Sequence, residues 1–193
     1  MASWGVPFEK DSQGRLLTTP GRGHKKTRLI MCNGHKLMDV MKQQLIDRGA
    51  RKLMVANVPD ISKIPETIEK AVQDPGILTR AAQVSVQFNQ KLKEALARIE
   101  QVNGLGIIKF DLFAVLNSIV ANGATNGLVF NDVACFDPDD FSYHPQCDFD
   151  RFVFFDNIHP TAAAHFIVGQ AMLSVVRSAD SATITGPLML LLE

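Results

Sequence analysis

The spacing of apolar residues along the chain predicts four helices. They cover residues 35–48, 77–102, 112–122 and 161–177. In the first, apolar side chains recur at the three- and four-residue spacing of one helix face, and Gly49 supplies the stop. The buried stripe predicted for the long second helix consists of Leu78, Ala81, Ala82, Val84, Ser85, Phe88, Leu92, Leu96 and Ile99.

Short apolar runs between these helices predict strands. Residues 53–58 form an uninterrupted run that is typical of a strand covered on both faces, and 107–111 form a second. The order strand, long helix, strand, helix is that of a parallel sheet with right-handed crossovers, so the predicted fold class is α/β. Residues 59–76, with three prolines, read as a surface loop with at most one short helix, and 123–151 as an irregular stretch.

Composition narrows the classes of function. The 20 Lys and Arg residues balance 20 Asp and Glu residues, which excludes a nucleic-acid binder that works through bulk positive charge. No apolar run approaches the roughly 20 residues that a membrane-spanning helix requires. The first residues also lack the pattern of a secretory signal peptide.

The chain divides into three parts by composition. Residues 1–28 are rich in glycine and read as a flexible segment, 29–178 as the folded domain and 179–193 as a tail. The first part holds a basic cluster, for which a solvated tail and a nucleic-acid or nuclear address are the two interpretations. This cluster consists of Arg22, His24, Lys25, Lys26 and Arg28.

The stretch FFDNIHPTAAAH at 154–165 carries the most chemical information. It places Asp156 three residues before His159, in a turn that opens a helix. An aspartate that accepts the Nδ1 proton of a histidine leaves Nε2 free to act as a base. The alternative is that Asp156 only caps the helix, with Pro160 in the first helical turn.

Several short motifs together resemble the C-terminal part of a GDSL-type (SGNH) esterase/lipase, most closely the bacterial secreted, autotransporter-linked and phospholipase or haemolysin-like members. The similarity covers about residues 37–176, and the Asp-x-x-His-Pro-Thr turn is its specific part. The motifs are GARK at 49–52, VPD at 58–60, FNQKL at 88–92, ACFD at 134–137 and FDNIHPT at 155–161.

This resemblance implies a flavodoxin-like three-layer α/β/α domain, incomplete on its N-terminal side, that hydrolyses small-molecule or lipid esters without a cofactor or metal. Asp156 would be the acid and His159 the general base of a Ser-Asp-His triad. The resemblance also implies secretion or a cell-surface location, and an autotransporter barrel in a longer parent chain.

The nucleophile departs from the family pattern. The chain has no Gly-Asp-Ser-Leu tetrapeptide, and Ser12 is the nearest candidate. Asn33-Gly34 is the nearest match to the asparagine and glycine that would hold the oxyanion. Three interpretations follow: a piece of a longer hydrolase, active or inactive; a hydrolase that uses Ser12; or an unrelated α/β binding module. The last predicts that Asp156 and His159 are not hydrogen-bonded to each other.

The cysteines and remaining histidines have simpler interpretations. In the lipases that this chain resembles, the region of Cys135 and Cys147 often holds a cysteine pair, which implies a disulfide. Zinc bound by these cysteines with His144 and His159 is the rival interpretation, but the spacings do not match structural zinc sites. The leftover Cys32 is expected to be buried, and His165 is expected to be packed and hydrogen-bonded.

Overall fold

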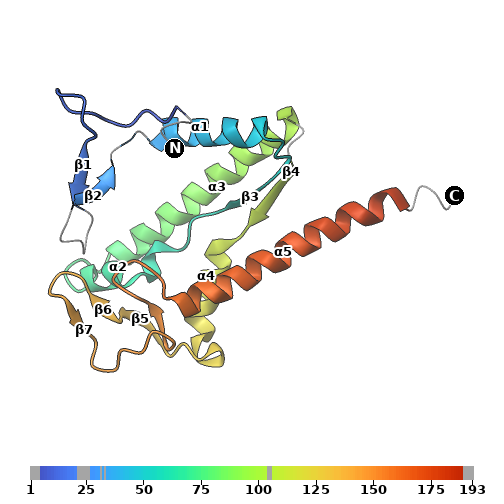
Figure 1. The fold of residues 1–193 in the computed structure, drawn as a ribbon. Helices are drawn as coiled ribbons and strands as arrows, with labels where there is room; N and C mark the ends of the chain where they lie inside the picture. Colours follow the sequence, from blue (N-terminus) through green and yellow to red (C-terminus); the bar gives the residue numbers. More distant parts are fainter. Residues whose placement is uncertain (1–4, 21–26, 31, 33, 104–105, 189–193) are drawn as a thin grey trace. The chain divides into compact units, whose positions relative to one another are not determined.

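The computed structural model describes residues 5–20, 27–30, 32, 34–103 and 106–188 (Figure 1). Contacts divide the chain into two compact units, 1–51 and 52–193. The sequence-based boundaries after residues 28 and 178 stay predictions. Of the helices in the described part of the chain, none combines the length and hydropathy needed to cross a membrane.

The first unit contains a short antiparallel strand pair and one helix. Strand β1 (Thr18–Pro20) pairs with β2 (Thr27–Ile30), and α1 (Gly34–Asp47) follows, which confirms the first predicted helix. Gly49, with a φ of 89°, adopts the left-handed conformation that favours glycine just after a helix end. Four residues of the basic cluster, Arg22, His24, Lys25 and Lys26, lie outside the described residues, and the fifth, Arg28, lies in β2.

The second unit begins with the predicted parallel strand pair. Strands β3 (Lys52–Ala56) and β4 (Gly106–Phe110) pair in parallel, from Lys52 opposite Gly106 to Ala56 opposite Phe110. Helix α3 (Ile77–Asn103) connects them and lies beside them (Figure 1), with Lys109 paired to Glu100 at 2.8 Å. The α/β class is therefore confirmed. Strand β3 is only half-buried, so the prediction that it is covered on both faces is wrong.

The face that α3 buries differs from the predicted stripe. Ser85 and Leu96 are buried as predicted, but Val84, Phe88 and Ile99 expose 57%, 51% and 39% of their surface. A polar residue of α3 supplies hydrogen bonds to the chain that follows β3. The Asn89 side chain accepts the N–H of Val58 at 2.9 Å and donates to the Val58 carbonyl at 2.9 Å. This pair of bonds fixes the chain just after β3 to α3.

The segment 59–76 contains the short helix that the prediction allowed, but it is more buried than the predicted surface loop. It forms a 3-10 turn, η2 (Ile61–Lys63), and a short helix, α2 (Pro65–Lys70). Four of its side chains are buried: Asp60, Ser62, Pro65 and Thr67. Prolines suit this segment because Pro65 occupies the first helical turn, where the missing N–H costs no hydrogen bond.

The remaining elements form the hydrophobic core beside the connection between β8 and α5. Helix α4 (Leu112–Asn122) has its predicted bounds and leads through η3 (Gly123–Asn126) into β5 (Phe130–Ala134). Strand β5 pairs in parallel with β8 (Phe152–Phe154), whereas the sequence predicted only an irregular stretch at 123–151. A small antiparallel pair, β6 (Phe136–Asp137) and β7 (Ser142–Tyr143), lies between them in sequence. The core cluster consists of Leu116, Ile119, Leu128, Val153, Phe154 and Ala164.

Helix α5 (Ala162–Leu188) is longer than predicted. The expected end near Arg177 is wrong because the helix continues past Asp180, whose carboxylate pairs with Lys52 of β3 at 2.8 Å. Apolar residues on its first turns pack on the core, among them Ala163, Ile167 and Val168.

The Asn89 contact yields a stability prediction. Replacing Asn89 with alanine leaves the N–H and carbonyl of Val58 without their partner, so the variant should lose roughly 1–3 kcal/mol of unfolding free energy. Urea denaturation followed by circular dichroism measures this loss. Gln90→Ala, on the exposed side of α3, is the matched control and should change stability by less than about 0.5 kcal/mol. Equal stability of the two variants would contradict the assigned role.

Candidate active site

The candidate site is a tight turn between β8 and α5. All three residues of β8 are fully buried, so the strand ends at a fixed point beneath the turn. The N–H of Phe155 then donates to the carbonyl of His159 at 2.7 Å, and Phe154 forms an antiparallel bridge with Pro160. These contacts fix both ends of the turn and leave the side chains of 156–159 in a compact loop.

Asp156 and His159 are joined inside this turn. Oδ1 of Asp156 accepts the backbone N–H groups of Ile158 at 2.8 Å and His159 at 2.7 Å. Nδ1 of the His159 ring lies 2.8 Å from Oδ2 and 3.0 Å from Oδ1. The predicted pairing is therefore present in the structure, and the interpretation in which these side chains are not hydrogen-bonded is wrong.

The two side chains differ sharply in exposure. The Asp156 side chain exposes 16% of its surface and the His159 side chain 69%. Because an ionised carboxylate can only accept, a neutral imidazole in this geometry carries its proton on Nδ1. Nε2 is then unprotonated and can accept a proton from another group.

Opposing effects act on the pKa of Asp156. Partial burial raises the pKa, but the backbone and ring hydrogen bonds from His159, the N–H of Ile158 and the charge of the ring outweigh it. The pKa of Asp156 therefore lies below its ordinary value. The carboxylate stays ionised at neutral pH, which is the state in which it can hold the Nδ1 proton and stabilise an imidazolium.

Thr161, and not Asp156, caps the last helix. The buried Thr161 hydroxyl accepts the N–H of Ala164 at 3.2 Å and donates to the carbonyl of Phe152 at 2.7 Å. Pro160 precedes this cap and so lies outside the first helical turn, contrary to the prediction. With the cap supplied by Thr161, the Asp156 carboxylate is directed to His159.

The start of α2, within the segment 59–76, supports the turn through a backbone hydrogen bond. Asn157 is buried, and its carbonyl accepts the N–H of Glu66 at 3.0 Å, at the start of α2. Sequence reasoning missed this support because a backbone carbonyl leaves no residue pattern. Pro65 in the first helical turn, just before Glu66, is the signal that could have indicated a fixed helix start here.

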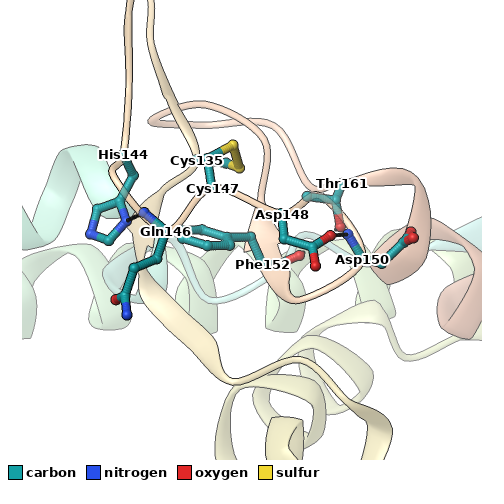
Figure 2. Close-up of a disulfide and its surroundings, with 8 residues drawn as sticks. All are labelled: Cys135, His144, Gln146, Cys147, Asp148, Asp150, Phe152 and Thr161. Atoms are coloured by element: carbon teal, nitrogen blue, oxygen red, sulfur yellow. Dashed lines mark hydrogen bonds between the residues drawn. A yellow bond between two sulfur atoms is a disulfide. The ribbon is translucent and has the colours of Figure 1, made fainter.

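A disulfide joins Cys135, which is hydrogen-bonded to the strand before the turn, to Cys147 (Figure 2). The implied pairing is confirmed, and it removes both cysteines from the rival zinc interpretation. Cys135 is fully buried and donates its N–H to the carbonyl of Phe154, at 3.1 Å. Figure 2 shows His144 and Phe152 beside the disulfide. The centroids of their rings are 5.3 Å apart.

The other predicted site residues lie elsewhere. Ser12 is exposed in the first unit, in a turn where Asp11 accepts the N–H groups of Gln13 and Arg15, and its role as nucleophile stays a prediction. Asn33 lies outside the described residues. His165 is exposed on α5, so its predicted packed position is wrong. Cys32 is a free thiol that is half-buried.

A separate hollow of about 430 Å³ lies beside the carboxyl ends of β3 and β4. Its lining includes Asn57, Asn89, Leu96, Phe110, Asp111 and Phe113, but neither Asp156 nor His159. Its two asparagines are engaged in holding the chain. Asn57 donates to Asp111 at 2.7 Å and accepts the N–H of Phe113 at 2.8 Å, and Asn89 holds Val58. The hollow therefore supplies no further group to the Asp156–His159 pair.

Comparison with known proteins places these residues in a family context. The model of the family described as GDSL-like Lipase/Acylhydrolase matches residues 24–172. One GDSL esterase/lipase of Arabidopsis thaliana is 24% identical over 178 residues, covering 83% of this chain and 48% of the relative. The thermolabile hemolysin of Vibrio parahaemolyticus is 28% identical over 142 residues, covering 67% of this chain and 33% of the relative. The chain thus spans about half or less of the length of these relatives.

The lowered pKa of Asp156 yields a pH-dependent prediction. A carboxyl group whose pKa is lower in the folded than in the unfolded state stabilises the fold above its unfolded pKa, and this stability is lost as the pH falls through the folded pKa. Asp156→Ala should therefore be less stable than the unmodified chain at pH 7, and the difference should shrink below about pH 4. Urea denaturation across this range measures it. A difference that stays constant with pH would contradict the ionised, hydrogen-bonded state of Asp156.

Proposed function

The chain belongs to the GDSL-like lipase/acylhydrolase family, and we propose that it hydrolyses carboxylic esters with Asp156 and His159 as the acid and base of a Ser-Asp-His triad. The observation that carries the proposal is the 2.8 Å contact between Oδ2 of Asp156 and Nδ1 of an exposed imidazole. This geometry leaves Nε2 of His159 in the state that a general base requires.

The proposed reaction follows from the protonation states of the two ring nitrogens of His159, with the proton on Nδ1 and none on Nε2. Nε2 of His159 takes the proton of a serine hydroxyl as the serine oxygen attacks the ester carbonyl carbon. The imidazolium that forms is stabilised by the Asp156 carboxylate, and it returns the proton to the leaving alkoxide as the carbon–oxygen bond breaks. Nε2 then takes a proton from water as the water oxygen attacks the acyl-serine carbonyl carbon. The imidazolium returns this proton to the serine oxygen as the acyl–oxygen bond breaks, which releases the carboxylic acid and regenerates the serine.

Two sources of the serine stand as proposals. One is Ser12, which lies in a turn of the first unit. The other is a Gly-Asp-Ser-Leu serine in a longer parent chain, of which this sequence would be the C-terminal part. His159 serves the same role in both cases, so the two proposals differ in the effect of removing Ser12.

The compartment is inferred from the disulfide beside the site, and the substrate class from the family. A disulfide that fixes a buried cysteine forms and persists in oxidising compartments. We therefore place the protein in a secreted or cell-surface setting, where small-molecule or lipid esters, and the breakdown of lipids, fit the family. Linkage to an autotransporter is a proposal that rests on resemblance alone.

Hydrolysis of a short-chain p-nitrophenyl ester tests the proposal. His159→Ala should lower kcat/KM by at least about 10³-fold, because the general base is lost. The exposed His165, on α5, provides a matched control, and His165→Ala should leave the rate unchanged. Loss of activity in Ser12→Ala would identify Ser12 as the nucleophile, whereas retained activity would place the nucleophile elsewhere.

Two results would overturn the proposal. Activity that survives in His159→Ala would show that this imidazole is not the base. Absence of turnover on short- and long-chain esters, both in the unmodified chain and in a longer parent chain that carries the Gly-Asp-Ser-Leu serine, would instead favour a catalytically inactive remnant of a hydrolase.

A further inference from the structure

Five aromatic side chains form an exposed patch next to the Asp156–His159 turn. We call this set the aromatic patch. The exposed fractions are 61% for Tyr143, 53% for Phe141, 43% for Phe149 and 37% for Phe155, while Phe136 is half-buried at its centre. A contiguous apolar surface of this kind on a folded protein usually marks an interaction site.

The rings of the aromatic patch contact one another in a closed circuit. Ring centroids are 5.0 Å apart for Phe136 and Tyr143 and 6.5 Å for Tyr143 and Phe149. They are 5.4 Å apart for Phe149 and Phe155 and 5.7 Å for Phe155 and Phe136. Phe141 joins from outside, 6.1 Å from Phe136. The rings therefore form one continuous surface.

The backbone at Phe141 indicates that this surface serves more than stability. Its φ is 60°, in the left-handed region that bulky residues rarely adopt and that asparagine or glycine adopts at lower cost. A phenylalanine here is both strained and half exposed. Neither feature favours the fold, so the ring has a role at the surface.

The aromatic patch is tied to the proposed catalytic turn. Phe155 directly precedes Asp156, its N–H donates to the His159 carbonyl at 2.7 Å, and its carbonyl accepts the N–H of Phe136 at 2.8 Å. Ile158, inside the turn, exposes a further 38% of its surface. A ligand of the patch would therefore contact residues that are hydrogen-bonded directly to the Asp156–His159 turn.

The charges of the residues around the aromatic patch limit which surfaces can bind to it. Residues 136–150 contain five aspartates and no lysine or arginine. Hydrogen bonds from Ser142 lower the pKa of Asp140, which keeps that carboxylate ionised. The nearby Arg151 lies over the Phe130 ring, at 5.6 Å, and Phe130 is outside the patch. An anionic surface would be repelled, whereas an uncharged or zwitterionic one would not.

We propose that the aromatic patch docks the protein on the surface of uncharged or zwitterionic lipid, with His159 facing the ester groups. Aromatic side chains suit this role because their apolar rings settle at the lipid–water boundary. A lipid aggregate carries ester groups itself, so docking on it would bring substrate to the site without a separate partner. The inference deepens the proposed ester hydrolysis, but the docking itself requires no turnover.

Vesicle flotation with the full chain tests the docking. The unmodified protein should float with vesicles of phosphatidylcholine and bind less to vesicles in which half the lipid is phosphatidylglycerol. Phe141→Asn and Tyr143→Asn should each weaken binding to phosphatidylcholine about fivefold, through loss of a ring from the boundary. Asparagine tolerates the left-handed backbone at position 141, so Phe141→Asn should fold normally, which circular dichroism checks.

The control is Phe88→Gln on α3, since Phe88 is exposed to 51%, close to the 53% of Phe141. It should bind vesicles as the unmodified chain does. The proposal is overturned if the unmodified chain does not bind phosphatidylcholine, if it prefers the anionic vesicles, or if all three substitutions have the same effect. Vesicle binding without ester hydrolysis, in this chain and in the longer parent chain, would refute the proposed function and leave the docking intact, and the reverse result would do the opposite.

Discussion

The Asp156 carboxylate accepts two backbone N–H groups and one ring N–H, all donated from within the next three residues. The two backbone bonds fix Oδ1 and shape the turn, so the ring of His159 meets a carboxylate whose position is already set. The same bonds lower the pKa of Asp156 against the effect of its burial. One group thereby determines the turn's conformation, the proton position on the imidazole and the charge that would stabilise an imidazolium.

The neighbouring elements hold this turn from several sides. Strand β8 ends in the core, Thr161 caps α5, the Asn157 carbonyl contacts α2, and the disulfide fixes Cys135 against the Phe154 carbonyl. These supports use backbone groups or buried side chains, so each restricts the turn without competing for the Asp156 carboxylate. The exposed imidazole is thus attached to a rigid turn. General-base catalysis favours this rigidity because the reacting groups must stay aligned.

Sequence reasoning predicted the parts that depend on local pattern. The bounds of α4, the β3–α3–β4 order and the Asp156–His159 pair all follow from spacing or from a short motif. It failed where contacts distant in the sequence decide the structure. Val84 and Phe88 fit the pattern of a buried helix face but are exposed. Asn89 instead joins α3 to the chain after β3, because its side chain is hydrogen-bonded to Val58. Strand β5 was missed because Asn131 and Asp132 break its apolar pattern, although pairing with β8 and the Asn131 bond to the Val120 carbonyl stabilise it.

The central claim is that Asp156 fixes the proton of the neutral His159 ring on Nδ1. Nitrogen-15 NMR of the ring, at a pH where the imidazole is neutral, measures this directly, with His159→Ala identifying the resonance. The account predicts a protonated Nδ1 and an unprotonated Nε2 in the unmodified chain, and loss of this preference in Asp156→Ala. A proton on Nε2 in the unmodified chain would contradict it, because that ring could not act as the base.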